Sequence, residues 1–164
     1  MLKTSDGLSA TTDSRGGYRI DGLKSNKRTV ITPQLDEYHF YPESFTVSFS
    51  GNTDFNDVFA YPKKTVKPTA FVYGGVASEI IADNVSNVEI VAISNENGKI
   101  TAQIVDEGDN PVNRLELDSQ ADVPAVFKWN MTSSSKKKVP SGEYSVILNG
   151  AGFSDEIVSF KLMR

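Results

Sequence analysis

Residues 139–148 read Val-Pro-Ser-Gly-Glu-Tyr-Ser-Val-Ile-Leu, and this stretch decides the kind of fold that the chain adopts. A Pro-Ser-Gly turn signal opens the stretch, and Tyr144, Val146 and Leu148 then place apolar side chains at alternate positions. Alternation with a period of two puts these side chains on one face of an extended strand. The stretch therefore predicts a turn that leads into a β-strand with one buried face.

The same alternation recurs along the chain in short runs separated by turn signals. These runs are residues 18–21, 45–49, 88–93, 100–104 and 157–162. Short strands with turns every 8–12 residues are typical of antiparallel sandwiches and barrels. No segment has the periodicity of a three-turn amphipathic helix. The sequence therefore predicts an all-β chain built from antiparallel β-sandwich modules.

The composition agrees with strands and excludes several chemistries. The 164 residues include 16 Val, 10 Ile and 11 Thr against 8 Leu, an excess of β-branched side chains that favours strands over helices. The absence of cysteine excludes disulfides, thiol nucleophiles and cysteine-based zinc sites. A net charge of -4 gives no field that attracts nucleic acid. No apolar run approaches the roughly 20 residues of a membrane span.

A segment rich in proline and lysine, residues 62–68, divides the chain. It holds two prolines and three lysines and is typical of a short, semi-extended linker. We therefore expect a first module over residues 1–61 and a second over residues 69–164. The first is small for an independent core. Residues 133–138, Ser-Ser-Ser-Lys-Lys-Lys, are expected to form an exposed hairpin loop.

Most of residues 8–61 resembles a known family. The resemblance is carried by Ala-Thr-Thr-Asp-Ser-Arg-Gly-Gly-Tyr-Arg-Ile-Asp-Gly-Leu at residues 10–23 and Tyr-His-Phe-Tyr-Pro at residues 38–42. These residues resemble the carboxypeptidase regulatory-like modules of bacterial surface proteins, close to the collagen-binding B-type repeats. The resemblance implies a prealbumin-like, seven-stranded sandwich.

Only residues 1–8 stand where that family has its first two strands, so the first module is expected to be incomplete. A sandwich that lacks a strand exposes an unpaired edge and part of its core. Two explanations are open. The chain is a fragment of a longer polypeptide, or a neighbouring subunit supplies the missing strand by β-augmentation.

Residues 97–164 resemble the immunoglobulin-like domain of flagellar hook-capping proteins and related C-terminal sorting domains of secreted bacterial proteins. The residues that carry this resemblance are 100–106, 110–112, 115–117, 127–130 and 139–146. The resemblance implies an immunoglobulin-like sandwich in which Trp129 fills the space between the sheets and Tyr144 returns the chain to the core. The family's usual Trp-Asp-Gly is here Trp129 followed by Asn130 and Met131, so we expect a longer hairpin.

No catalytic residue is predicted, and the chain is not expected to be an enzyme. His39, the single histidine, lies between Tyr38 and Phe40, which the alternation turns together toward the core. It is therefore expected to be exposed rather than to act as a catalytic base. Ser141 lies in a turn between strands and not in the strand-elbow-helix of a hydrolase.

Two groups of residues are weak candidates for ligand binding. The first is an acidic neighbourhood made of Asp106, Glu107, Asp109, Asp118 and Asp122. Solvated loops explain it best, with calcium as the alternative and Asp106 and Asp109 as its candidates. No other cofactor or metal is expected.

The second group is aromatic, and it comprises Tyr18, Tyr38, Phe40, Tyr41 and Phe45. A core of about 60 residues needs this many rings, so core packing is the preferred interpretation. Tyr41 and Tyr61 are expected to be the exposed rings and are candidates for stacking against sugar.

These observations favour a non-enzymatic structural or adhesive protein of a bacterial extracellular or cell-surface assembly, with its first module completed by a neighbouring strand. Its expected partners are other protein subunits, copies of itself included, or the rest of a longer polypeptide, and not nucleic acid. The alternatives are a carbohydrate-binding accessory module of a longer secreted enzyme, or a secretion-sorting or cap domain. The first residues carry no apolar segment of a secretory signal, so the surface location rests on the resemblances.

Overall fold

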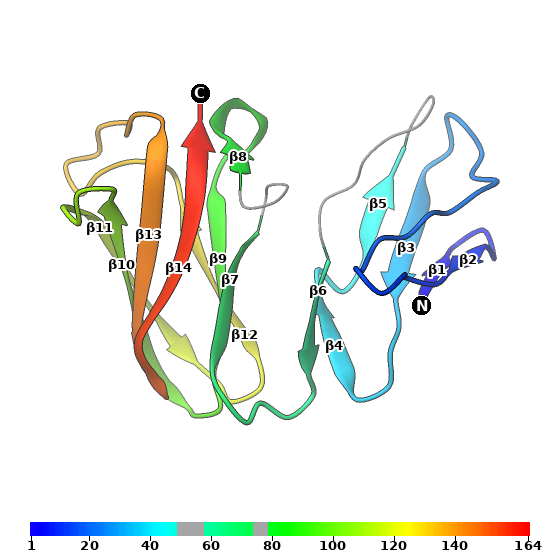
Figure 1. The fold of residues 1–164 in the computed structure, drawn as a ribbon, viewed down its shortest axis with the longest axis horizontal. Coiled ribbons are helices and arrows are strands. Elements are labelled where there is room, and N and C mark those ends of the chain that lie inside the picture. Colours follow the sequence, from blue (N-terminus) through cyan, green and yellow to red (C-terminus); the bar gives the residue numbers. More distant parts are fainter. Residues whose placement is uncertain (49–57, 74–78) are drawn as a thin grey trace. The chain divides into compact units, whose positions relative to one another are not determined.

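The computed structural model describes residues 1–48, 58–73 and 79–164 (Figure 1). The chain separates into two compact units, Met1–Lys63 and Lys64–Arg164. Apart from one three-residue 3-10 turn, the regular structure of the described residues consists of strands, nearly all of them antiparallel. The prediction of an all-β chain of antiparallel sandwich type is confirmed. The described residues include no helix with the length and apolarity that a bilayer crossing requires.

The second unit is a sandwich of two sheets. Its strands are β7 (Thr69–Tyr73), β8 (Glu79–Ile81), β9 (Val88–Ile93), β10 (Gly98–Asp106), β11 (Pro111–Ser119), β12 (Pro124–Trp129), β13 (Gly142–Gly150) and β14 (Phe153–Met163). The 3-10 turn η1 (Ala82–Asn84) follows β8. One sheet has the order β11-β10-β13-β14-β8 and the other β12-β9-β7, with β8 parallel to β14 (Figure 1). This topology is that of an immunoglobulin-like sandwich.

A large apolar core fills the space between these two sheets. Trp129 is fully buried, and its ring centroid lies 5.5 Å from that of Tyr144 and 6.1 Å from that of Phe160. The Tyr144 hydroxyl donates a hydrogen bond of 2.9 Å to the carbonyl of Pro140, four residues upstream. Such a tyrosine corner at the start of a strand is a recurrent feature of these sandwiches. The expected core positions of Trp129 and Tyr144 are therefore confirmed.

The first unit has shorter strands and a much smaller core. Its strands are β1 (Leu2–Thr4), β2 (Ser9–Ala10), β3 (Thr29–Pro33), β4 (Tyr38–Tyr41), β5 (Phe45–Val47) and β6 (Phe59–Pro62). Four of them form a sheet in the order β2-β1-β3-β5, and β4 pairs with β6 as a separate ribbon. The buried cluster consists of Leu2, Ile31 and Val47.

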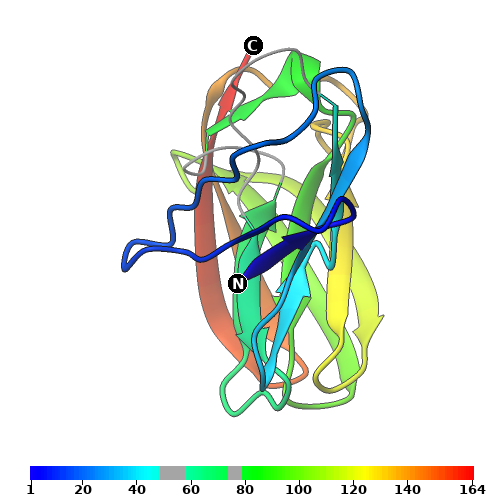
Figure 2. The same cartoon turned by 90° about the vertical axis from the view of Figure 1, so that its right-hand side faces the viewer.

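The strand predicted at residues 18–21 is wrong, because the connection between β2 and β3 runs without a strand (Figure 2). The Asp13 carboxylate instead closes a local turn by accepting the backbone N–H groups of Arg15 and Gly17. Tyr18 and Ile20 are nevertheless half-buried against the small core. The alternating pattern therefore predicted correctly that Tyr18 and Ile20 pack against the core, but it did not predict whether their backbone pairs with a neighbouring strand. In the neighbouring run 45–49, β5 covers the first three residues, and Phe49 lies outside the described residues.

The segment 133–138 is exposed as expected, but the strands on either side of it do not pair with each other. It connects β12 to β13, and these two strands belong to opposite sheets. A single bridge between Thr132 and Lys138 closes the loop at its base. Backbone bonds from Ser133 to Lys137 and from Val139 to Met131 also close the segment, so it is a small antiparallel hairpin although β12 and β13 do not pair with each other.

Candidate functional site

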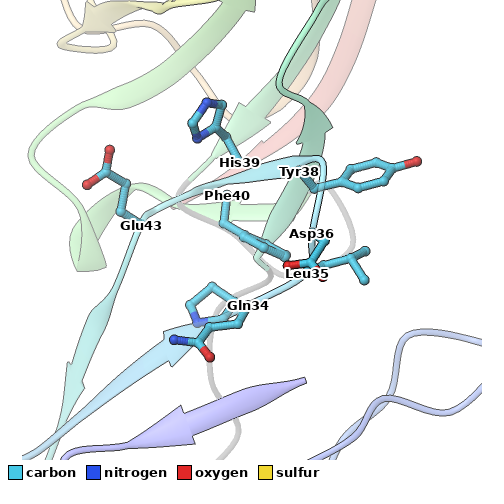
Figure 3. Close-up of a pocket in the computed structure, with 8 residues that line it drawn as sticks. Gln34, Leu35, Asp36, Tyr38, His39, Phe40 and Glu43 are labelled. Carbon is cyan, nitrogen blue, oxygen red and sulfur yellow. The ribbon is translucent and has the colours of Figure 1, made fainter.

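A shallow pocket of about 350 Å³ lies in the first unit, beside strand β4 (Figure 3). Its lining residues are Pro33, Gln34, Leu35, Asp36, Tyr38, His39, Phe40 and Glu43. They come from the end of β3, from the turn that follows it and from β4 with the residue beyond. We call this the Tyr38 pocket, because Tyr38 is its most accessible ring.

The apolar wall of the Tyr38 pocket is unusually exposed. Leu35 is 55% exposed and Tyr38 is 40% exposed, while Phe40 is half-buried. The backbone N–H of Tyr38 bonds the carbonyl of Leu35 at 3.3 Å, and Glu37 between them has a left-handed φ of 64°. This tight turn holds both apolar side chains at the surface, where they are available to a partner.

The polar groups of the pocket include both acceptors and donors, since the Gln34 amide and the His39 ring carry N–H groups. Asp36 and Glu43 contribute carboxylates, Gln34 contributes an amide, and no lysine or arginine lines the pocket among the described residues. Within the described part of the chain, the side chains of Gln34, Asp36 and Glu43 make no hydrogen bond or ion pair. The Glu43 carboxylate and the Tyr38 ring lie at opposite ends of β4 and point away from each other, so these two side chains do not converge on one ligand (Figure 3).

His39 lies on the opposite side of β4 from Phe40 (Figure 3). Its side chain is exposed, as the sequence predicted, and its ring centroid lies 5.6 Å from that of Tyr61 on β6. The register pairs these two residues directly across the ribbon. Among the described residues, the His39 ring therefore contacts the ring of Tyr61.

The structure corrects the predicted positions of the rings. Tyr38 was expected to share a core-facing side with Phe40, yet it is an exposed side chain. The more buried face of the ribbon carries Tyr41, Phe59 and Tyr61. Alternation shows that two residues share a face, but tertiary packing decides which face is covered.

The exposure predicted for Tyr61 is wrong, because this ring is only 5% exposed. Burial, and after it the Glu43 carboxylate, raises the pKa of Tyr61 above its usual value. Tyr41 is half-buried. A sugar-stacking platform of Tyr41 and Tyr61 is therefore not what the surface presents, and the accessible ring is Tyr38. The sequence signal for this site was the run Leu-Asp-Glu-Tyr at residues 35–38.

The acidic residues of the second unit are dispersed. Asp106 closes the turn between β10 and β11, where its Oδ1 accepts the backbone N–H groups of Gly108 at 3.0 Å and Asn110 at 2.9 Å. These bonds, those of Asn110 first, lower the pKa of Asp106. Asp109 lies in the same turn. Among the described residues, no three acidic, histidine or cysteine side chains gather in a way that would hold a metal ion.

Asp118 and Asp122 lie at the other end of the hairpin from Asp106 and Asp109. The nine residues of β11 extend over about 30 Å between the two ends. The Asp122 carboxylate accepts the backbone N–H of Thr65 and thereby anchors the segment that leads into β7. The neighbourhood that looks acidic in the sequence is therefore two separate turns.

Ser141 has a structural role. Its Oγ accepts the backbone N–H of Arg164 at 3.0 Å, and the Arg164 Nε donates to the carbonyl of Val139 at 2.9 Å. These bonds tie the end of β14 to the segment that precedes β13. Ser141 is thus engaged with backbone and not with a base.

Comparisons with known proteins identify no family. No family model matches the sequence, and no curated protein is similar to it. Two similar solved structures come from Porphyromonas gingivalis. One is PorZ, an essential bacterial surface component of the type-IX secretion system, with a TM-score of 0.40 and 13% identity over 98% of this chain. The other is dimeric latent PorU, with a TM-score of 0.41 and 11% identity over 99% of this chain.

The chain spans 17% of the length of PorZ and 16% of the length of PorU. At these scores the likeness identifies neither a family nor a function. The functional argument therefore rests on the geometry of the two units.

Proposed function

We propose that this chain is a non-enzymatic structural or adhesive β-sandwich protein of a bacterial extracellular or cell-surface assembly, and that a β-strand from a neighbouring subunit completes its first unit. The observation that carries this proposal is the inequality of the two cores. The surface location rests on the resemblance of both units to bacterial surface and secreted modules.

Among the described residues, the core of the first unit is smaller than the core of the second unit. Among the described residues, Leu2, Ile31 and Val47 form its buried cluster, with Tyr18, Ile20 and Phe45 half-buried around them, and Tyr61 is buried outside this cluster. Burying one such aliphatic side chain contributes about 1.5–3 kcal/mol. A further strand would add buried apolar surface to this core.

The outer strand β5 is a suitable acceptor for such a strand. It pairs with β3 on one side and is the last strand of its sheet among the described residues. Phe45, the first residue of β5, is half-buried at this edge. A strand at the end of a sheet can accept an added strand from a neighbouring subunit.

We also propose that the chain does not catalyse a reaction. The single histidine contacts the Tyr61 ring, and Ser141 accepts a backbone N–H. Neither lies beside a group that would activate it for proton transfer or nucleophilic attack. We therefore expect the chain to act through contacts with partners rather than through catalysis.

Sedimentation velocity and hydrogen exchange test the proposal on the full chain. We expect association that increases with protein concentration, together with slower exchange of the β3 and β5 amides in the associated state. The Thr46→Lys variant places a charge on the edge strand and is expected to weaken association. Thr101→Lys, on the central strand β10, is the matched control and is expected to leave association unchanged.

A chain that stays monomeric at all concentrations, with its first unit as well protected from exchange as its second, would overturn the proposal. Equal association by the wild type and by Thr46→Lys would show that β5 is not the acceptor.

A further inference from the structure

We propose that a second copy of this chain pairs with the outer edge of β11 in the second unit. The two β11 strands run antiparallel, with Glu116 opposite Glu116 and with Arg114 opposite Asp118 of the other copy. The five-stranded sheets of the two copies then continue as one sheet across a two-fold axis. This inference goes beyond the proposed function, because it concerns the second unit and not the completion of the first.

Among the described residues, β11 is the longest outer strand of the second unit. The two sheets of this unit end in β11, β8, β12 and β7, and β11 has nine residues against three, six and five. β10 pairs with one side of β11, and within the described part of the chain no strand pairs with its other side (Figure 1). An outer strand of this length can accept a strand from another copy.

Contacts with the loop after β12 leave residues 114–118 as the accessible part of this edge. The backbone N–H of Ser134 bonds the carbonyl of Val112 at 2.8 Å, and the Asn113 Nδ2 bonds the carbonyl of Thr132 at 2.9 Å. This loop therefore covers the start of β11, as natural proteins often cover a strand edge. An incoming strand pairs with the part of β11 that follows.

Two leucines on the core-facing side of β11 are matched across the proposed axis. Leu115 and Leu117 pack against the core of the sandwich, yet both are only half-buried. In the proposed register, Leu115 of each copy lies opposite Leu117 of the other. Facing apolar side chains on paired strands stabilise a sheet, and this contact removes more of their surface from water.

Opposite charges meet in this register on the solvent-facing side of the joined sheet. Glu116 accepts hydrogen bonds from Arg114 at 2.9 Å and from Lys99 on β10 at 3.2 Å. Asp118 is exposed and makes no ion pair with the described residues, so its carboxylate is available to Arg114 of the other copy. The two Glu116 side chains face each other at the axis, where Lys99 of each copy offsets their repulsion.

Other registers of the two β11 strands fit less well. Core-facing residues of one copy must lie opposite core-facing residues of the other, so the register changes in steps of two residues. A shift toward the start of β11 brings the incoming strand to Val112, whose carbonyl already accepts the N–H of Ser134. A shift the other way places Glu116 opposite Asp118, and two facing carboxylates repel each other.

A pair of charge variants of the full chain tests the register by sedimentation equilibrium. Arg114→Asp and Asp118→Arg each place like charges at both facing pairs, so each alone is expected to dimerise about tenfold more weakly than the wild type. An equimolar mixture of the two variants restores opposite charges at both pairs and is expected to form the heterodimer. The double variant Arg114→Asp with Asp118→Arg is expected to dimerise with itself.

Cysteine cross-linking tests the position of the axis, because the chain has no cysteine of its own. Directly opposite residues of an antiparallel pair have Cα atoms roughly 4.5–5.5 Å apart, a separation that a disulfide spans. Glu116→Cys is therefore expected to form a disulfide-linked dimer in a glutathione redox buffer. Arg114→Cys is the matched control, since its two thiols would lie about 13 Å apart along the strand, and it is expected to stay unlinked.

Two further variants separate this contact from net charge. Arg19→Asp and Asp21→Arg make the same charge changes at exposed positions of the first unit and are expected to keep wild-type dimerisation. Circular dichroism melts identify any variant that fails to fold.

Cross-linking of Glu116→Cys no faster than that of Arg114→Cys, or a mixture of the charge variants that stays monomeric, would overturn the inference. Association that survives in both charge variants but is lost in Thr46→Lys would overturn the β11 contact and leave strand completion supported. Loss in the charge variants with retention in Thr46→Lys would support the β11 contact against strand completion.

Discussion

The two units are built from the same alternating pattern, yet only the second closes around a large core. Its strands β10, β11 and β13 have nine residues each, and β14 has 11. The strands of the first unit have two to five residues. A short strand turns only one or two side chains toward the core, so a sheet of such strands buries little. Among the described residues, strand length, more than pattern, therefore separates the sandwich with the large core from the one with the small core.

The largest expected effect is on the second unit, where Trp129 joins the two sheets. Trp129→Ala should destabilise this unit by about 3–5 kcal/mol, because it removes a fully buried ring that contacts Tyr144 and Phe160. Urea unfolding followed by amide NMR signals of each unit would measure it. The signals of the first unit should keep their midpoint. If the unfolding midpoints of both units shifted together, the two units would unfold as one cooperative body, and their stabilities could not be compared separately.

A matched pair of substitutions compares the two cores directly. Ile31 in the first unit and Ile104 in the second are both fully buried, and Ile→Ala costs about 2–5 kcal/mol in such positions. We expect Ile31→Ala to unfold the first unit, because its small core leaves little stability to lose. Ile104→Ala should leave the second unit folded with a lower midpoint. Site-resolved hydrogen exchange distinguishes the outcomes, and equal protection in both variants would contradict the contrast.

The smallest expected effect is a loss of stability at alkaline pH that depends on Tyr61. Its pKa is raised in the folded chain, first by burial and then by Glu43, so the unfolded chain ionises this phenol at lower pH than the folded chain does. The stabilisation is thus complete below the usual tyrosine pKa of about 10 and is lost as the pH rises through the folded pKa. Tyr61→Phe should flatten this dependence in the first unit. Phenolate absorbance during a pH titration measures the shift, and a normal Tyr61 pKa would contradict it.

The sequence predicted the second unit better than the first. The run 88–93 coincides with β9, and the runs at residues 100–104, 144–148 and 157–162 lie within β10, β13 and β14. These strands alternate over enough residues for the pattern to be unambiguous. At residues 18–21 the pattern spans only four residues, and the chain there packs two side chains without pairing its backbone.

The candidate site was harder to predict because it depends on distant contacts. The sequence drew attention to Tyr41 and Tyr61, whereas the accessible ring is Tyr38. The pocket forms where the turn after β3 brings Leu35 and Asp36 beside β4. Nothing in the local pattern shows which side of that ribbon is covered, since both sides carry aromatic residues.

The sequence by itself determined that this chain is all-β and that Trp129 and Tyr144 lie in a core. These properties follow from alternation and side-chain chemistry, which are local. Only the tertiary structure decided that β12 and β13 belong to opposite sheets, that the acidic residues separate into two turns, and that Tyr38 is the exposed ring. Each of these depends on which segments meet in space, and a period of two carries no information about the neighbour on either face.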